Sequence, residues 1–339
     1  MILSLVKREI WLDIAKGFSI IFVVMGHSGD ILANHYLSWF RMPLFFILSG
    51  FLFKPVIPQN FFNWAKKKTK NMLIPYASYG ILITLIFFVF EPTIIAFIKN
   101  ILKLAYGGIV LQGQYGVFWF ITCLLMTQLV FGYLSRYSTK VQIIVIIFAY
   151  VLAHLGSILS FSKIPFPGNF DVVLITLTYY SIGYYAKEII ATSIKKVSVF
   201  LISALLWISF VILDMEGILL FELNLKYKIY HNLLLDICIP LIIAVSICSA
   251  CFWLSKLDSL RYLAKLGSNS IAIMYLHIPI NLLTKNLLNI DYGLLTYTII
   301  GIAGSLIVLV LFRKSKILSR LFLSPNSRQY STGNLLRNA

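Results

Sequence analysis

Long apolar segments without charge constrain this chain more than any other feature of its sequence. Residues 197–213 and 293–312 contain no charged side chain, and a helix needs only about 20 apolar residues to cross a bilayer. Charged residues make up 12% of the chain, about half their usual share in a soluble domain. The sequence therefore predicts an all-α, polytopic membrane bundle and excludes a soluble enzyme. Because the apolar runs are continuous rather than alternating, they do not fit a membrane β-barrel.

Hydropathy and helix length together predict about ten transmembrane helices within one integral membrane domain, residues 1–312. Segment 91–115 has the pattern of an amphipathic helix at the outer surface. Residues 313–339 are polar and basic, which predicts a mobile cytoplasmic tail in contact with anionic lipid. The predicted spans are residues 10–28, 39–57, 73–90, 116–135, 141–160, 171–190, 197–214, 233–254, 270–288 and 293–312.

The positive residues fall mainly on one side of these predicted spans. If the N-terminus is cytoplasmic, 22 of the 29 Lys and Arg residues lie on the cytoplasmic side. Cytoplasmic loops of membrane proteins collect Lys and Arg in this way, so the asymmetry predicts that both termini are cytoplasmic. The same rule accounts for the net charge of +17 without a nucleic-acid partner, because no separate basic domain occurs.

The cysteines and histidines do not form a metal motif. Cys248 and Cys251 are three residues apart, but no second pair of ligands accompanies them. All four cysteines lie in apolar runs, which is typical of small packing residues. No His-x-x-x-His pair is present, so the sequence predicts no metal site.

The first predicted helix carries a stripe of polar side chains. At 100° per residue, His27 lies within about 40° of both Asp13 and Lys16 around the helix, so the three residues share one face. Ionisable groups within a span are costly in lipid and usually face the bundle interior or a wet cavity. Two interpretations remain open: a functional stripe, or an Asp13–Lys16 pair at the inner edge with His27 at the outer interface.

Other ionisable residues are expected near the outer end of this helix or within the bundle. Arg41 opens the second span, either as an interface anchor or as a contact for an anion or carbonyl oxygen. Asp236 begins the eighth span and is expected either to orient a histidine, to pair with Arg41 or to lie at the interface. Of the histidines, His27 and His277 are the better candidates for proton transfer. The alternative for each is the structural role that a lone histidine in a helix often has.

Four segments of the chain resemble the membrane acyltransferase-3 family, and within it the fucose 4-O-acetylase-like branch. They are REIWLDIAKGFSIIFVVMGHS, FRMPLFFILSGFLF, GVFWFITCLL and LGSNSIAIMYLHIP. They follow one another in the family's order from residue 8 to about residue 280. The family's first-helix histidine corresponds to His27, and its LDxLRG arginine corresponds to Lys16. Branch members often have His before M-P-L-F-F, where this chain has Arg41.

The resemblance implies a ten-helix O-acyltransferase of a bacterial-type cytoplasmic membrane. Its acyl donor is expected to be acetyl-CoA, used as a substrate with no bound cofactor, and its acceptor a cell-surface glycan or a lipid-linked precursor. The predicted catalytic residues are His27, Arg41 and His277. The predicted substrate-binding residues are Asp13, Lys16, Trp119, Tyr275 and Asp236. A glycolipid transporter or flippase, or a succinyl rather than acetyl transferase, remains the alternative.

Overall fold

The computed structural model describes residues 9–159, 165–260 and 262–323, and this part of the chain is helical without a β-strand. The first helices are α1 Ile10–Met25, α2 Ile31–Ser38, α3 Arg41–Phe51, α4 Phe61–Phe88, α5 Ile94–Tyr106, α6 Phe118–Leu134, α7 Thr139–Ile158 and α8 Val173–Tyr185. They are followed by α9 Lys187–Ser193, α10 Val197–Met215, α11 Leu235–Leu254, α12 Tyr262–Ser268, α13 Ser270–Leu288, α14 Leu294–Arg313 and α15 Lys316–Phe322.

Seven segments in the described ranges are long and apolar enough to cross a membrane, and they contain α4, α6, α7, α10, α11, α13 and α14. Three further predicted spans correspond to α1, α3 and α8, which have 16, 11 and 13 residues. A straight helix of 16 residues is about 24 Å long, shorter than a typical hydrocarbon core. The prediction of an all-helical, multi-pass membrane protein is confirmed, and the count of about ten spans stays a prediction.

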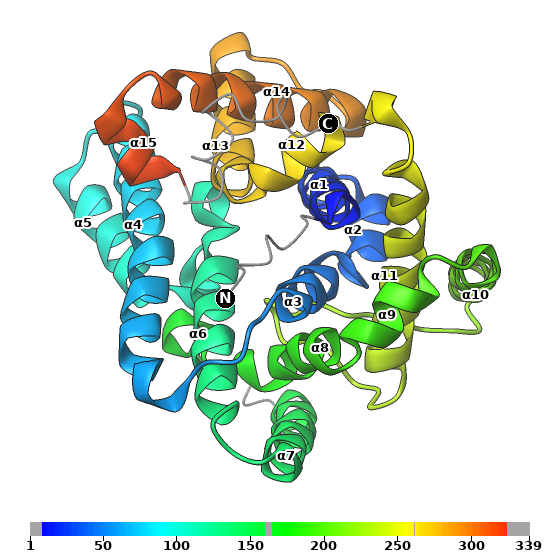
Figure 1. Ribbon diagram of the computed structural model, residues 1–339. Helices are drawn as coiled ribbons and strands as arrows, with labels where there is room; N and C mark the ends of the chain where they lie inside the picture. Colours follow the sequence, from blue (N-terminus) through cyan, green and yellow to red (C-terminus); the bar gives the residue numbers. More distant parts are fainter. Residues whose placement is uncertain (1–8, 160–164, 261, 324–339) are drawn as a thin grey trace.

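The outward faces of the long helices are apolar, as a lipid environment requires. On α10, Leu201, Leu205 and Ile208 are each more than half exposed, and Ile144 and Phe148 are comparably exposed on α7. In water such surfaces would associate, whereas in hydrocarbon they carry no penalty. Figure 1 shows α7 and α10 at the edge of the bundle.

Helix α1 lies inside the bundle, in contact with α3, α11, α12, α13 and α14 (Figure 1). Its crossing with α12 is close because both helices have glycine at the contact. A Cβ atom on Gly267 would lie 1.8 Å from the carbonyl oxygen of Asp13, and one on Gly17 would lie 2.6 Å from that of Leu263. Small residues at such crossings let backbones approach closely in membrane proteins. Gly267 thus serves the packing of α12 against α1.

The connection from α1 to α3 is short and sharply bent. Gly29 has a φ of +92°, a conformation that costs glycine little. Asp30 then caps α2, its Oδ1 accepting a hydrogen bond of 2.8 Å from the backbone N–H of Ala33. This turn brings His27, two residues after α1, and Arg41, at the start of α3, into the lining of one cavity.

The C-terminal segment begins as an ordered helix. Phe322 of α15 lies 5.0 Å from Tyr79 of α4 and 4.3 Å from Phe312 of α14, measured between ring centroids. The start of the predicted tail therefore packs on the bundle, whereas residues 324–339 lie outside the described residues. The predicted surface helix in 91–115 is α5, on which Ile94 and Ile95 are strongly exposed.

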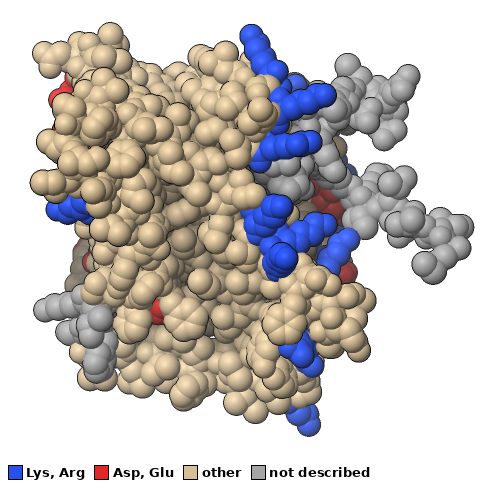
Figure 2. All heavy atoms as spheres, turned by 90° about the vertical axis from the view of Figure 1, so that its left-hand side faces the viewer, with Lys and Arg blue, Asp and Glu red and all other residues tan. Residues whose placement is uncertain are grey.

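The charged side chains divide unevenly over the surface. Figure 2 shows Lys and Arg concentrated along one end of the face in view, while the rest of that face carries few of them. On α4, Lys66, Lys67 and Lys70 are exposed. This one-sided distribution is the pattern that the positive-inside rule describes.

Candidate active site

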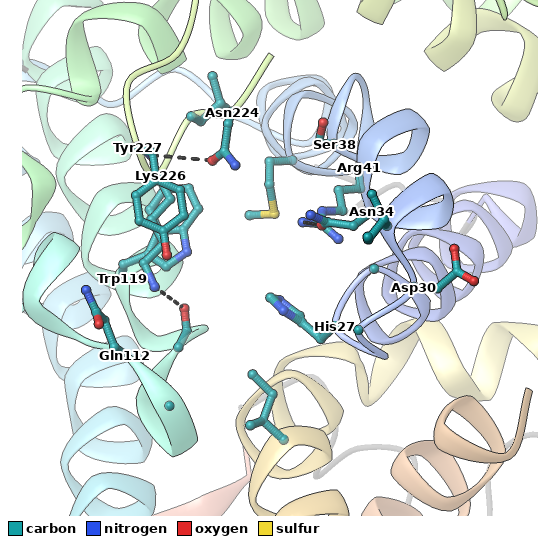
Figure 3. A pocket seen from close by; sticks show the side chains of 18 residues that line it. His27, Asp30, Asn34, Ser38, Arg41, Gln112, Trp119, Asn224, Lys226 and Tyr227 are labelled. Atoms are coloured by element: carbon teal, nitrogen blue, oxygen red, sulfur yellow. Dashed lines mark hydrogen bonds between the residues drawn. The ribbon is translucent and has the colours of Figure 1, made fainter. Parts of the chain in front are cut away.

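A cavity of about 510 Å³ opens where the α1–α2 turn, α2 and α3 face the start of α6 and the loop before α11 (Figure 3). Its lining is polar on several sides, although the elements that form it are largely apolar. The residues that line it are Gly26, His27, Gly29, Asp30, Ile31, Asn34, Ser38, Arg41, Met42, Gln112, Gly113, Gly116, Trp119, Asn224, Leu225, Lys226, Tyr227 and Ile278.

His27 lies in this cavity beside a second histidine. The ring centroids of His27 and His277 are 5.4 Å apart, and His277 is fully buried within α13. The Nδ1 of His277 is 2.9 Å from the carbonyl oxygen of Ile273, so Nδ1 carries the proton. In the neutral ring Nε2 is then an acceptor, and it has no hydrogen-bond partner among the described residues. These two histidines are 250 residues apart in the sequence, so only the fold brings them together.

Arg41 presents one end of its guanidinium to the same cavity. Its Nη2 donates a hydrogen bond of 2.9 Å to Oδ1 of Asn34, while Nη1 is buried without a partner in the described part of the chain. The guanidinium fits against the backbone of Gly26, where a Cβ atom would lie 1.5 Å from Nη1. An unpaired buried N–H is costly, so Nη1 is suited to bind an oxygen atom of a substrate.

Lys226 reaches the opposite wall from the loop before α11 (Figure 3). Its Nζ donates hydrogen bonds of 2.7 and 3.0 Å to the carbonyl oxygens of Leu111 and Gly116. Burial lowers the pKa of this ammonium group to about 8. Lys226 and Arg41 both lie near enough to act electrostatically on His27.

The cavity is electropositive. Asp30 is the one carboxylate among its described lining residues, and it lies at the exposed rim, where it caps α2. Arg41 and Lys226 are both more than nine-tenths buried. Two buried cations beside one cavity favour a ligand that is anionic or that develops negative charge.

Of the predicted substrate-binding residues, Trp119 lines the cavity and Tyr275 does not. Trp119 belongs to the first turn of α6 and is 5% exposed. Tyr275 is fully buried in an aromatic cluster, 4.6 Å between ring centroids from both Tyr79 and Phe118. Trp119 and Tyr275 come from two different family segments, and the fold places only Trp119 at the cavity.

Asp13 and Lys16 form an ion pair near the start of α1, with 3.6 Å between Nζ and Oδ1. Neither residue lines the cavity. His27 is 11 residues beyond Lys16, which is about 16 Å along a helix. The predicted stripe therefore has its inner polar pair and its outer histidine in separate environments.

Asp236 orients a histidine, but not one in the cavity. Its Oδ2 lies 2.9 Å from Nε2 of His154 and accepts a hydrogen bond from the backbone N–H of Asn232. The hydroxyl of Tyr150 donates to the carbonyl oxygen of Leu233 in the same region. These contacts fix the junction between α11 and the loop that carries Lys226.

Several residues of the cavity were missed by reasoning from sequence alone. Lys226, Asn224 and Gln112 come from connecting segments between predicted spans. One signal was available for Lys226: it is one of only seven positive residues expected on the side that such proteins keep poor in Lys and Arg. In the described ranges, no group of three or more His, Cys, Asp or Glu residues is arranged to hold a metal ion.

The cavity combines a histidine that can exchange a proton, an arginine N–H that has no partner in the described part of the chain, and a second buried cation. These are the parts that acyl transfer needs: a base for the attacking group and positive charge where a carbonyl oxygen becomes an oxyanion. Together with the apolar helices, these side chains define a multi-pass membrane protein whose cavity contains the chemical groups of a group-transfer enzyme.

Comparison with known families supports this description. Residues 9–314 match the family model for the acyltransferase domain of the acyltransferase-3 family. The match covers most of the chain, so the protein belongs to this family and is a membrane O-acyltransferase. Searches among curated proteins and among solved structures found no similar protein. The expectation of an enzyme, rather than a transporter, is thereby confirmed.

Proposed function

We propose that the protein transfers an acetyl group from cytoplasmic acetyl-CoA to a hydroxyl group of a cell-surface glycan or its lipid-linked precursor. The observation that carries this proposal is the cavity that brings together His27, Lys226 and Arg41, whose Nη1 has no partner among the residues that the structure describes. The motif resemblance to the fucose 4-O-acetylase-like branch supports a sugar acceptor.

The residues of the cavity suggest a direct sequence of bond changes. His27 accepts the proton of the sugar hydroxyl as its oxygen attacks the thioester carbonyl carbon. Arg41 Nη1 donates a hydrogen bond to the carbonyl oxygen as it becomes negative. The carbon–sulfur bond then breaks, and the CoA thiolate takes the proton from the His27 imidazolium. Proton transfer of this kind typically contributes about 10²–10⁴-fold to the rate.

His277 acts in this proposal as a positioning residue. Its Nε2 is an acceptor beside His27, so it can hold the His27 ring through the N–H that does not face the substrate. A base oriented by a third group is the usual arrangement in covalent and acid–base catalysis. The alternative route, in which His27 itself carries the acetyl group before the hydroxyl attacks, uses the same atoms.

The distribution of charges also supports a particular orientation in the membrane. We propose about ten membrane crossings, with both termini cytoplasmic, in a bacterial-type inner membrane. The one-sided distribution of Lys and Arg supports this orientation (Figure 2). In it, the cavity with His27 lies toward the outer side, and the cationic face meets the CoA phosphates in the cytoplasm. The acyl-pantetheine arm must then pass between the helices.

The test is acyl transfer by the purified protein in nanodiscs, with radiolabelled acetyl-CoA and a panel of glycans. Wild-type protein is expected to label at least one glycan. His27→Gln is expected to lose about 10²-fold or more of the rate while it still binds acetyl-CoA, because glutamine cannot carry the proton. A His27→Gln protein that accumulates normally and transfers at the wild-type rate would contradict the role of His27. A wild-type protein that labels no glycan would contradict the acceptor class.

A further inference from the structure

A second cavity lies on the lipid-facing side of the bundle and is distinct from the cavity with His27. It is an apolar groove of about 530 Å³ between α10 on one side and α1 and α11 on the other. Figure 1 shows α10 outside the main group of helices, next to α11. The lining is apolar except for Tyr36, Ser246 and Cys251. A sugar or a nucleotide would find few hydrogen-bond partners there.

The groove is long and runs along the span. On α10 its lining extends from Phe200 to Ile212, which is about 18 Å at 1.5 Å per residue. This length covers more than half of a hydrocarbon core of about 30 Å. An extended hydrocarbon chain, aligned with the neighbouring lipid tails, matches both the shape and the polarity of the groove.

The groove adjoins the candidate active site. The ring of Phe40 contacts Phe22 and Trp207, both of the groove, with centroid distances of 5.4 and 5.3 Å. The next residue in the chain is Arg41, whose guanidinium lines the reaction cavity. Phe40 thus links the lining of the groove to the lining of the reaction cavity.

Helix α2 joins the outer ends of the two sites. Tyr36 on one side of α2 lines the groove, while Asn34 and Ser38 line the reaction cavity. The distance to be bridged is about one helix diameter, 10–12 Å. A molecule with its tail in the groove would therefore have its head group at the cavity after crossing α2.

The charge of the cavity indicates which chemical group joins the hydrocarbon tail of the bound molecule to its head group. Beside Arg41, whose Nη1 is assigned to the carbonyl oxygen, Lys226 is a second buried cation in the lining of the cavity. Phosphate esters suit such a pair of cations well. An apolar groove beside an electropositive cavity is complementary to an amphipathic anionic lipid.

We propose that the groove between α1, α10 and α11 binds the hydrocarbon tail of a lipid-phosphate-linked glycan, which is the acceptor of the acyl group. This assignment rests on the proposed function and narrows its acceptor to the lipid-linked form. The acetyl group of the donor is too short to fill such a groove.

The test uses a photoactivatable polyprenyl phosphate and the full-length protein in nanodiscs that contain phosphatidylglycerol. After irradiation, we expect labelled peptides from α10 and α11, with labelling suppressed by unlabelled polyprenyl phosphate. Ala204→Trp and Ala250→Trp place a large ring inside the groove and are expected to reduce labelling about fivefold or more, equivalent to roughly 1 kcal/mol. Ile202→Trp is the matched control, because Ile202 is also on α10 and is exposed but lies on the opposite side of the helix from the lining of the groove.

Two results would overturn the assignment: equal labelling of all three variants, or equal suppression by added phosphatidylglycerol, which would mean that the groove holds ordinary membrane lipid. The readout does not depend on catalysis. Intact labelling of a wild-type protein that transfers no acyl group would therefore contradict the proposed function and leave the groove assignment standing. Acyl transfer without labelling of the groove would contradict the groove assignment and leave the proposed function standing.

Discussion

Gly26 offers a sharp test of the candidate site, because its substitution by alanine should displace Arg41 and little else. The φ and ψ of Gly26 are −69° and −3°, which any residue adopts, so alanine strains no backbone here. An alanine Cβ would, however, lie 1.5 Å from Arg41 Nη1 and 2.7 Å from Cζ. Contact between such atoms is favourable near 3.5–4.0 Å, so the guanidinium must move about 2 Å.

The expected loss of transfer rate follows from the displacement of the guanidinium. A misplacement of 1 Å at a reacting centre can cost about 10²-fold in rate, or about 2.7 kcal/mol. Gly26→Ala should therefore reduce the rate of acetyl transfer about 10²-fold or more, while the protein accumulates normally. Gly156→Ala is the control, because a Cβ atom there has no neighbour within 4 Å and should leave the rate unchanged.

A double-mutant cycle checks that the effect acts through Arg41. In an Arg41→Ala background the clash is absent, so adding Gly26→Ala should change the transfer rate less than about twofold. If the second substitution costs as much in that background as in the wild type, Gly26 acts by another route and the reasoning about the guanidinium fails.

Three further predictions concern the same cavity and the membrane orientation. Arg41→Lys should lose most of the activity, since Lys lacks the planar fork; equal turnover would remove Arg41 from the site. Because burial lowers the pKa of Lys226 to about 8, its ammonium group loses its proton as the pH rises through about 8, so acetyl transfer should decline between roughly pH 7 and 9. Lys226→Met should be slow throughout and lack this alkaline decline in a pH–rate profile, and a decline that persists in the variant would assign it to another group. Reporter fusions after Ile57 and after Ala339 should both report cytoplasm, and an outward C-terminus would mean that one span is wrongly drawn.

The local part of the candidate site was predictable from the sequence. His27 and Arg41 are separated by one short helix and a turn, so their closeness depends on a connection that the chain itself keeps short. The helical, multi-pass character was equally accessible, because hydropathy over about 20 residues is a local property. The family segments around these residues led to the acyltransferase assignment.

The remaining partners depend on contacts between distant segments, which no local pattern encodes. Lys226 bonds to Leu111 and Gly116, more than 100 residues away, and His277 meets His27 through the packing of α13 against α1. Tyr275, two residues before His277, falls on another face of α13 and packs on Tyr79 instead. Successive helical residues point 100° apart, so only the packing of the helices decides which of them faces the cavity and which the aromatic cluster.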